Sequence, residues 1–236
     1  AFRTRRRGFE TTFSYQARNQ WVADAAYNLQ RVRFQRDRAL YEPGRTTSSI
    51  SVGLRRDTRD DPLDTRGGNY IRTRLEMAGG PLGGASDYNR STLEVMSFRP
   101  LLGAVLGIHS QFSGIDASGD LSRVAEYEQF YLGGDRSVRG YGRGEIGADR
   151  VGELAFNGQL ELRLPIATHA VVLYVDAGQV WTDFSEIAID DLRRASGVGL
   201  RYNSRFGLIR FDVAVAHDDG SLGDNVALYF GVGQAF

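Results

Sequence analysis

The sequence predicts an all-β fold: an antiparallel transmembrane β-barrel, with about 11 to 12 strands in this chain. Three observations predict it. Apolar and polar residues alternate with a period of two, the strand-like spans are long, and short links tend to alternate with long ones. The alternation is clearest at Leu160, Leu162 and Leu164, which are separated by polar residues.

The alternation defines eleven strand-like spans, most of them 10 to 14 residues long. They lie at residues 8–17, 20–35, 46–57, 68–79, 87–99, 103–115, 152–165, 169–182, 193–204, 207–217 and 225–236. Strands of soluble proteins are typically about 5–6 residues long, whereas tilted membrane strands have roughly 9–11. The spans therefore favour a membrane barrel over a soluble sandwich.

The links suggest an orientation. Outer-membrane barrels have short periplasmic turns and longer external loops. If Phe236 ends the last strand at the periplasmic face, the short turns are periplasmic and the stretch at about 115–151 is a long external loop. The link at 57–67 is the exception, because it is long but falls on the short side. Counting back, the first span starts outside the cell, so an odd strand number predicts the C-terminal portion of a larger barrel.

Composition excludes several classes of protein. The chain has no Cys, which excludes a disulfide scaffold and a Cys-based metal site, and its formal net charge of +0 does not favour nucleic acid. No run approaches the roughly 18–20 apolar residues of a membrane helix.

A glycine-rich stretch lies in the longest link and reads YLGGDRSVRGYGRG at 131–144. Its Val138, Arg139, Gly140 and Tyr141 resemble the V-R-G-F/Y motif of the BamA/TamA superfamily, envelope proteins that assemble or secrete other β-rich proteins. Two spans later, YVDAG, with Asp176 and Gly178, resembles the aromatic-x-Asp-x-Gly strand motif of the same family.

Three further segments resemble the family in the same order along the chain. GVGLRYNSRFGLIRFDVA at 197–214 resembles the hairpin after the strand motif, and DTRDDPLDTRGG at 57–68 resembles a periplasmic turn, which accounts for the exceptional long link. The C-terminal LYFGVGQAF resembles the terminal strand, a signal carried by Leu228, Phe230, Val232 and Phe236.

The resemblance implies a sixteen-stranded barrel preceded by periplasmic POTRA domains. Residues 1–236 would form the barrel portion without a POTRA domain, and the loop at about 115–151 would fold back into the lumen, where Arg139 pairs with Asp176. It also implies a place in the outer membrane of a Gram-negative cell. The expected partners are outer-membrane lipid and lipopolysaccharide, unfolded β-rich client proteins, and POTRA domains or accessory proteins, but no nucleic acid.

Alternation independently places Asp176 inside the barrel. Val171, Leu173 and Val175 are apolar and should face lipid, which turns Tyr174 and Asp176 inwards. A charged side chain facing lipid at mid-depth costs about 2–4 kcal/mol, or somewhat less for Asp. A solvated Arg139 and an Asp176 with other partners remain the alternative.

The other candidate sites have weaker support from the sequence. His109 and Ser110 are adjacent on one strand and so face opposite sides, which excludes a catalytic dyad. Asp218, Asp219 and Asp224 could ligate a divalent cation, but acidic surface loops are usually just solvated. The arginines at 3 and 5–7 could touch lipopolysaccharide phosphates if they are external; we interpret them as a frayed end.

The sequence therefore predicts an outer-membrane assembly or translocation barrel that handles unfolded β-rich polypeptides without covalent chemistry. The alternatives are a two-partner-secretion transporter of the same superfamily and a passive outer-membrane pore. We expect no enzyme activity, no cofactor and no metal site.

Overall fold

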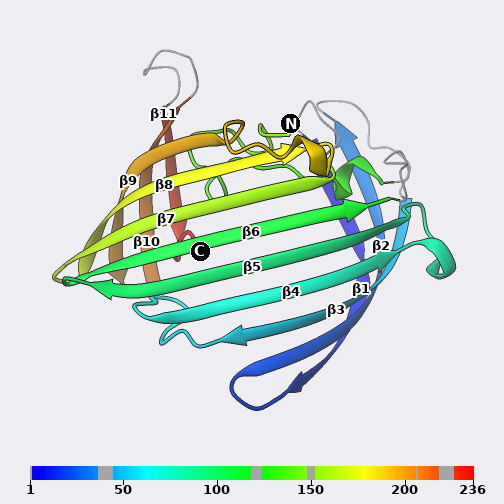
Figure 1. The fold of residues 1–236 in the computed structure, drawn as a ribbon, viewed down its shortest axis with the longest axis horizontal. Helices are drawn as coiled ribbons and strands as arrows, with labels where there is room; N and C mark the ends of the chain where they lie inside the picture. The colour runs from blue at the N-terminus through cyan, green and yellow to red at the C-terminus, as the bar shows by residue number, and fades with distance from the viewer. Residues whose placement is uncertain (1, 37–44, 118–123, 148–151, 206, 218–225) are drawn as a thin grey trace.

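The computed structural model describes residues 2–36, 45–117, 124–147, 152–205, 207–217 and 226–236, which form one antiparallel sheet of 11 strands (Figure 1). Each strand pairs with its neighbours in sequence. The strands are β1 (Phe2–Gln16), β2 (Trp21–Arg36), β3 (Arg45–Asp57), β4 (Gly68–Ala78), β5 (Tyr88–Leu101), β6 (Ala104–Asp116), β7 (Leu154–Ile166), β8 (His169–Trp181), β9 (Arg193–Ser204), β10 (Gly207–Ala216) and β11 (Val226–Val232). The all-β, antiparallel prediction is confirmed.

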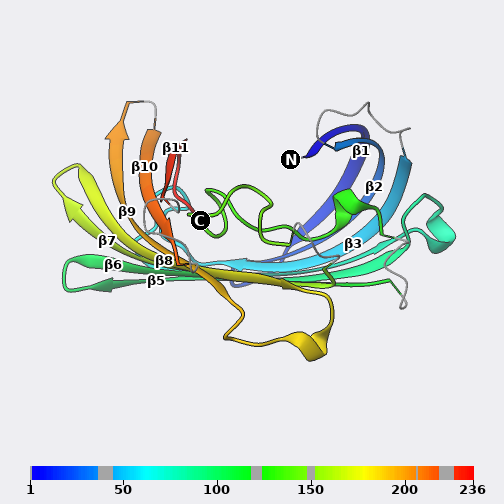
Figure 2. The ribbon, with the colours of Figure 1, turned by 90° about the horizontal axis from the view of Figure 1, so that it is seen from above.

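The sheet is curved into an open trough with β1 and β11 at its two edges (Figure 2). The segment between β6 and β7 lies in the hollow of the trough, whereas the segment between β8 and β9 projects from the outer side (Figure 2). The hollow side is called the inner face below, and the opposite side the outer face.

All eleven predicted strands are present, but two of their ends were wrong. The first strand begins at Phe2 rather than at residue 8, because Phe2 to Gln16 pair continuously with β2. The last strand ends at Val232, not at Phe236, because Gly233 has a φ of 91° and turns the chain away. Phe236 instead lies on the inner face, where its ring stacks on Phe98 and His109.

The two faces differ as alternation predicts. On β8, Val172, Tyr174 and Asp176 on the inner face are at most 3% exposed. Leu173 and Val175 on the outer face are 45% and 48% exposed. The outer face is thus apolar and the inner face carries the polar groups, the pattern of a lipid-facing barrel wall.

The connections between strands include tight hairpin turns and short 3₁₀ turns. Leu102 and Gly103 join β5 to β6 in two residues with φ of 49° and 86°, a left-handed pair that matches the twist of a hairpin. In the described part of the chain, the regular structure outside the strands consists of short 3₁₀ turns, such as Phe184–Glu186. No helix in the described part of the chain is long and apolar enough to cross a membrane.

The long link between β3 and β4 is a structured turn that reaches the inner face. Backbone bonds close its base, from Thr58 N–H to the carbonyl of Asn69 at 2.8 Å and from Asp60 N–H to that of Gly67 at 3.1 Å. Its Thr65 is 3% exposed and accepts a hydrogen bond from Arg163 of β7 at its carbonyl, at 3.5 Å.

Candidate functional site: a loop anchored on the inner face

The inward loop between β6 and β7 folds its tip into a compact hairpin. Leu132 and Ile146 exchange both backbone hydrogen bonds, at 2.9 and 3.1 Å. Within this frame, Ser137 Oγ accepts from the N–H of Gly133 at 2.7 Å, and the carbonyl of Tyr141 accepts from Gly134 at 3.0 Å. These bonds present residues 138–141 to the strands behind them. Of the loop expected at 115–151, residues 118–123 and 148–151 lie outside the described residues.

The structure brings Arg139 and Asp176 together. The Arg139 guanidinium donates from Nε to Asp176 Oδ2 at 2.7 Å and from Nη2 to Oδ1 at 2.8 Å, and its backbone N–H donates to Oδ2 at 3.0 Å. This is the two-pronged arrangement that suits a planar guanidinium and a carboxylate. Both side chains are fully buried.

Two further carboxylates converge on the same guanidinium. Nη1 of Arg139 donates to Glu161 of β7 at 2.9 Å and lies 3.5 Å from Asp212 of β10. Tyr174 of β8 supports the group from one side, with the Arg139 Cζ 3.4 Å from its ring centroid. We call Arg139, Asp176, Glu161 and Asp212 the loop anchor.

Three arginines on the strands balance the charge of the loop anchor. Arg163 pairs with Glu161 at 3.0 Å, and Arg201 pairs with Asp212 at 2.5 Å. Arg210 lies 3.4 Å from Asp212 and 3.0 Å from Asp135 of the loop. Four guanidiniums thus contact four carboxylates. Their mutual attraction offsets much of the desolvation free energy of the buried charges.

Glycines allow the loop tip to lie against the wall. A Cβ on Gly178 would lie 2.7 Å from Val138 Cγ2, and one on Gly140 would lie 2.9 Å from the backbone nitrogen of Ala216. Gly140 also has a φ of 99°, which side-chain-bearing residues rarely adopt. Gly199 of β9 has a similar role on the wall, because a Cβ there would overlap Asp212.

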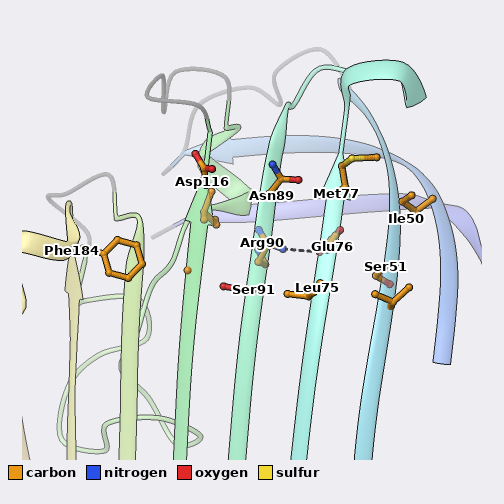
Figure 3. Close-up of a pocket in the computed structure, with 13 residues that line it drawn as sticks. Ile50, Ser51, Leu75, Glu76, Met77, Asn89, Arg90, Ser91, Asp116 and Phe184 are labelled. Carbon is orange, nitrogen blue, oxygen red and sulfur yellow. Dashed lines mark hydrogen bonds and ion pairs between the residues drawn. The ribbon is translucent and has the colours of Figure 1, made fainter. Parts of the chain in front are cut away.

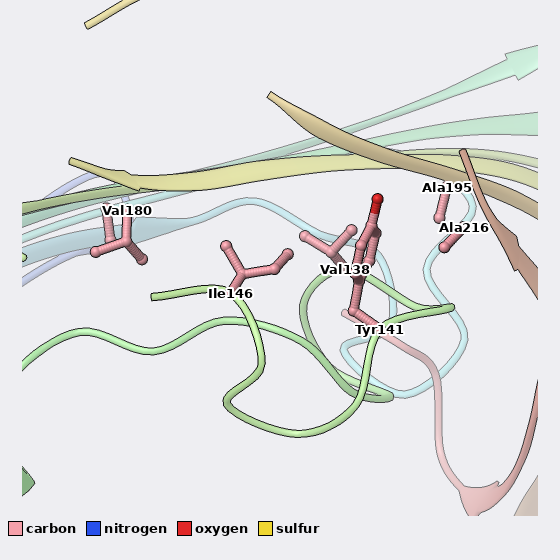
Figure 4. Packing of buried hydrophobic residues seen from close by; sticks show 7 residues of the cluster. Val138, Tyr141, Ile146, Val180, Ala195 and Ala216 are labelled. Carbon is pink, nitrogen blue, oxygen red and sulfur yellow. The ribbon is translucent and has the colours of Figure 1, made fainter. Parts of the chain in front are cut away.

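Apolar packing completes the docking. Val138, Tyr141 and Ile146 of the loop form a buried cluster with Val180, Ala195 and Ala216 of the strands (Figure 4). The Tyr229 hydroxyl of β11 accepts from the N–H of Gly140 at 3.0 Å and donates to the carbonyl of Tyr141 at 3.1 Å. The loop tip is therefore bound to β7, β8, β9, β10 and β11.

The charge state of Arg139 is fixed. Burial by itself lowers the pKa of its guanidinium, but the hydrogen bonds to Asp176 and the charges of Asp176, Glu161 and Asp212 raise that pKa overall. Arg139 therefore stays protonated. Removing one partner from such a buried charge network typically costs about 3–5 kcal/mol, because the remaining charges lose their compensation.

The motif residues named from the sequence all lie at or near this site, except for the C-terminal signal. Leu228, Phe230 and Val232 of β11 are 65–73% exposed on the outer face, and Phe236 stacks elsewhere on the inner face. Sequence reasoning missed Glu161, Asp212, Arg201 and Arg210. Alternation puts them on the inner face, but no sequence signal showed that they meet.

The surroundings of His109 do not support a catalytic site. His109 is hydrogen-bonded to Gln159 at 2.9 Å and Glu94 at 3.1 Å, with no nucleophile among these contacts. Within the described ranges, no group of three or more His, Asp or Glu side chains is placed to hold a metal ion. Asp218, Asp219 and Asp224 lie outside the described residues.

A shallow cavity of about 410 Å³ lies near the loop-side ends of β3 to β6 (Figure 3). Ser91 and Gly114 are paired in register, and their small size leaves a hollow between Leu75 and Phe184. Two charged residues of the lining, Arg90 and Glu76, pair with each other at 3.4 Å. This cavity is a hollow in the wall without the convergent polar groups of a catalytic site.

Comparisons with known proteins agree with this geometry. The model of the Omp85 superfamily domain matches residues 1–236. The chain is 29% identical over 208 residues to an outer membrane protein assembly factor BamA of Nitratidesulfovibrio vulgaris, covering 82% of this chain and 26% of that protein. It is 32% identical over 164 residues to the chloroplastic protein TOC75 of Pisum sativum, covering 63% of this chain and 19% of that protein.

Solved structures show the same fold. BamA from Haemophilus ducreyi lacking POTRA domains 1–3 superposes with a TM-score of 0.79 at 16% identity, over 98% of this chain and 54% of that one. CdiB from Acinetobacter baumannii superposes with a TM-score of 0.66 at 18% identity, over 96% and 41%. The chain spans about a quarter of the curated BamA relative and about half of the solved BamA chain.

Proposed function

Because this chain belongs to the Omp85 superfamily, we propose that it is the barrel portion of a protein that assembles or translocates unfolded, β-rich polypeptides at an outer membrane. One observation carries the proposal: the inward loop is fixed to the wall by the loop anchor, with Arg139 and Asp176 both fully buried. This loop lies in the hollow of the trough. A loop fixed there favours a polypeptide-handling barrel over a passive pore, whose conductance would be steady and large.

The fold suggests how such a barrel would act. A strand edge offers unpaired backbone donors and acceptors, onto which an incoming strand can pair. Of the described strands, β11 is the shortest, with 7 residues paired to β10, and its other edge has no partner strand in the sheet. A strand with few pairs to its neighbour makes a weak seam, where client strands would enter without any covalent step.

The proposed partners follow from the same role. The BamA relative is named an outer membrane protein assembly factor. By analogy, this chain would act on unfolded outer-membrane or secreted proteins, with POTRA domains or accessory proteins on the periplasmic side. We place it in the outer membrane of a Gram-negative bacterium, in contact with lipid and lipopolysaccharide.

The second candidate is a two-partner-secretion transporter, which passes one substrate through its lumen. The segment GGDRSVRGY at 133–141 favours it, because the residues of this loop motif resemble those of the TamA and two-partner-secretion branches. A passive pore is the third candidate, with the loop only narrowing the lumen.

Reconstitution of the full-length protein in vesicles separates these functions. Assembly predicts that an unfolded β-barrel client, added outside, becomes a heat-modifiable, membrane-inserted species. Secretion predicts that a client is recovered in the vesicle interior, protected from protease, and a pore predicts a steady large conductance with neither product. Arg139→Ala should reduce client assembly while Arg136→Ala, an exposed arginine three residues away, should not. Equal assembly by both variants would contradict the role of the loop anchor.

A further inference from the structure

We propose that Arg5, Arg7, Arg31 and Arg33 form a binding site on the outer face for the phosphate-bearing headgroup of an anionic membrane lipid. These residues belong to β1 and β2, so the interpretation of the first arginines as a frayed end was wrong. In register, Arg5 lies opposite Arg33, and Arg7 lies opposite Arg31. The inference rests on the proposed membrane placement of the barrel but not on its assembly activity.

The four side chains point away from the hollow. Side chains two apart share a face, so Arg5 and Arg7 lie on the same side as Phe9, Phe13 and Tyr15, which are 54–74% exposed. Their neighbours in between point the other way: Arg6 reaches the carbonyl of Tyr127 in the inward loop at 3.5 Å, and Val32 packs on the same loop. All four arginines are exposed.

Their height on the wall matches a headgroup layer. The lipid-facing band of a barrel is about 25 Å tall, and strands tilted by about 40° rise through it with roughly 10 residues at 3.4 Å each. Counted from the aromatic Tyr15 near the short-turn rim, that distance ends at Arg5. β2 ends at the same rim as β6, from which the inward loop leaves, so the arginines lie just above the apolar band on the loop side.

The charges of this site have no protein partner in the described part of the chain. None of the four guanidiniums forms an ion pair or a side-chain hydrogen bond with a described residue. Like charges directly opposite each other on neighbouring strands are destabilising, and here two such pairs are stacked. An anion between them would turn this repulsion into attraction.

The space between the side chains suits a phosphate. The four arginines line a cavity of about 110 Å³, well above the roughly 10–15 Å³ that one water needs. Guanidinium forks match phosphate oxygens bidentately, and arginine is preferred where such planar recognition matters. The exposed ring of Phe9 and the half-buried ring of Tyr27, 5.9 Å apart by centroid, lie directly below and would contact the upper part of the acyl chains.

Native mass spectrometry of the full-length protein in detergent tests the proposal. Wild type should retain bisphosphorylated lipid A and release its dephosphorylated form. Replacing all four arginines by Gln should lower retention about tenfold or more, in line with the loss of several cationic contacts at a lipid surface. The matched control replaces four exposed arginines at the opposite rim, Arg18, Arg56, Arg66 and Arg99, and should retain the lipid.

Three outcomes would overturn the proposal. Equal retention by wild type and the quadruple variant would show that the four arginines do not bind the lipid. Equal retention of phosphorylated and dephosphorylated lipid by wild type would show that the phosphate is not recognised, and this comparison needs no variant to fold. Saturable binding of inorganic phosphate that displaces lipid A at equal concentration would assign the site to a free anion instead.

Discussion

The inward loop touches two walls of the trough, and the two walls hold it by different chemistry. At β2 and β3, Val32 packs on Ala125 and Tyr127, and the hydroxyls of Tyr127 and Thr47 lie 3.4 Å apart. At β7 to β10, the loop tip is held by the loop anchor, with a guanidinium inside a set of buried carboxylates. We call β2 and β3 the neutral wall, because their contacts with the loop are apolar and neutral. Beside this wall, Arg90 of β5 pairs with Glu128 of the loop at 3.2 Å, so one charged contact also holds this end of the loop. The loop anchor differs in that a whole network of buried charges fixes its geometry.

The difference shows how a glycine-rich loop can be held in one position. Apolar contacts are non-directional, so they tolerate sliding. A bidentate guanidinium–carboxylate pair fixes both position and orientation. We infer that the neutral wall contributes area, and that the loop anchor decides where the tip lies.

The largest effect is expected from Arg139→Ala, which leaves three buried carboxylates without their shared cation. We expect undocking of the tip to become easier by about 3–5 kcal/mol. Hydrogen exchange at residues 132–146 of the full-length protein measures it. Arg136→Ala, which removes an exposed arginine of the same loop, should leave exchange unchanged; equal exchange in the two variants would remove the distinction between the walls.

Gly178→Ala should have the next largest effect. Its new Cβ would lie 2.7 Å from Val138 Cγ2 and 2.8 Å from the carbonyl oxygen of Phe156, so the tip or the strand must shift. Overpacking of this kind costs about 1–3 kcal/mol. Protease cleavage within the tip should accelerate, whereas Gly67→Ala, where the nearest atom is 3.9 Å away, is the control that should not change it.

Arg139→Lys separates charge from geometry at the same position. Lysine keeps the positive charge but cannot form the two-pronged contact with Asp176. Hydrogen exchange of the tip should fall between wild type and Arg139→Ala. Protection equal to that of wild type would mean that charge alone holds the tip.

Tyr127→Phe should have the smallest effect, because it removes one hydroxyl contact at the neutral wall. A single neutral hydrogen bond contributes about 0.5–1.5 kcal/mol. Exchange should rise at residues 124–128 and stay constant at 138–141. A rise at both ends of the loop would show that the two walls act as one unit.

The strands could be predicted from the sequence because successive residues of a barrel strand face opposite sides, which produces an alternation of apolar and polar residues. Leu160, Leu162 and Leu164 identify β7 without any tertiary information. The same rule failed at the chain's first residues, where arginines occupy outward positions that apolar residues occupy elsewhere. It failed again after Val232, where the backbone angle of Gly233, not hydropathy, ends β11.

Only part of the loop anchor could be predicted from the sequence. Family resemblance named Arg139 and Asp176, and alternation placed Asp176 on the inner face. Glu161 and Asp212 carry the same alternation signal, but they lie 15 residues before and 36 residues after Asp176. Whether they reach one guanidinium depends on the register and curvature of β7 to β10, which the sequence pattern does not contain.

The central claim is that Arg139 and Asp176 act as a pair, and a double-mutant cycle on tip protection tests it most directly. Arg139→Ala, Asp176→Ala and the double variant are compared with wild type by hydrogen exchange in the full-length protein. The two losses should be non-additive, with a coupling of about 0.5–3 kcal/mol, because each single change already removes the contact between Arg139 and Asp176. Losses that add within about 0.3–0.5 kcal/mol would contradict the account.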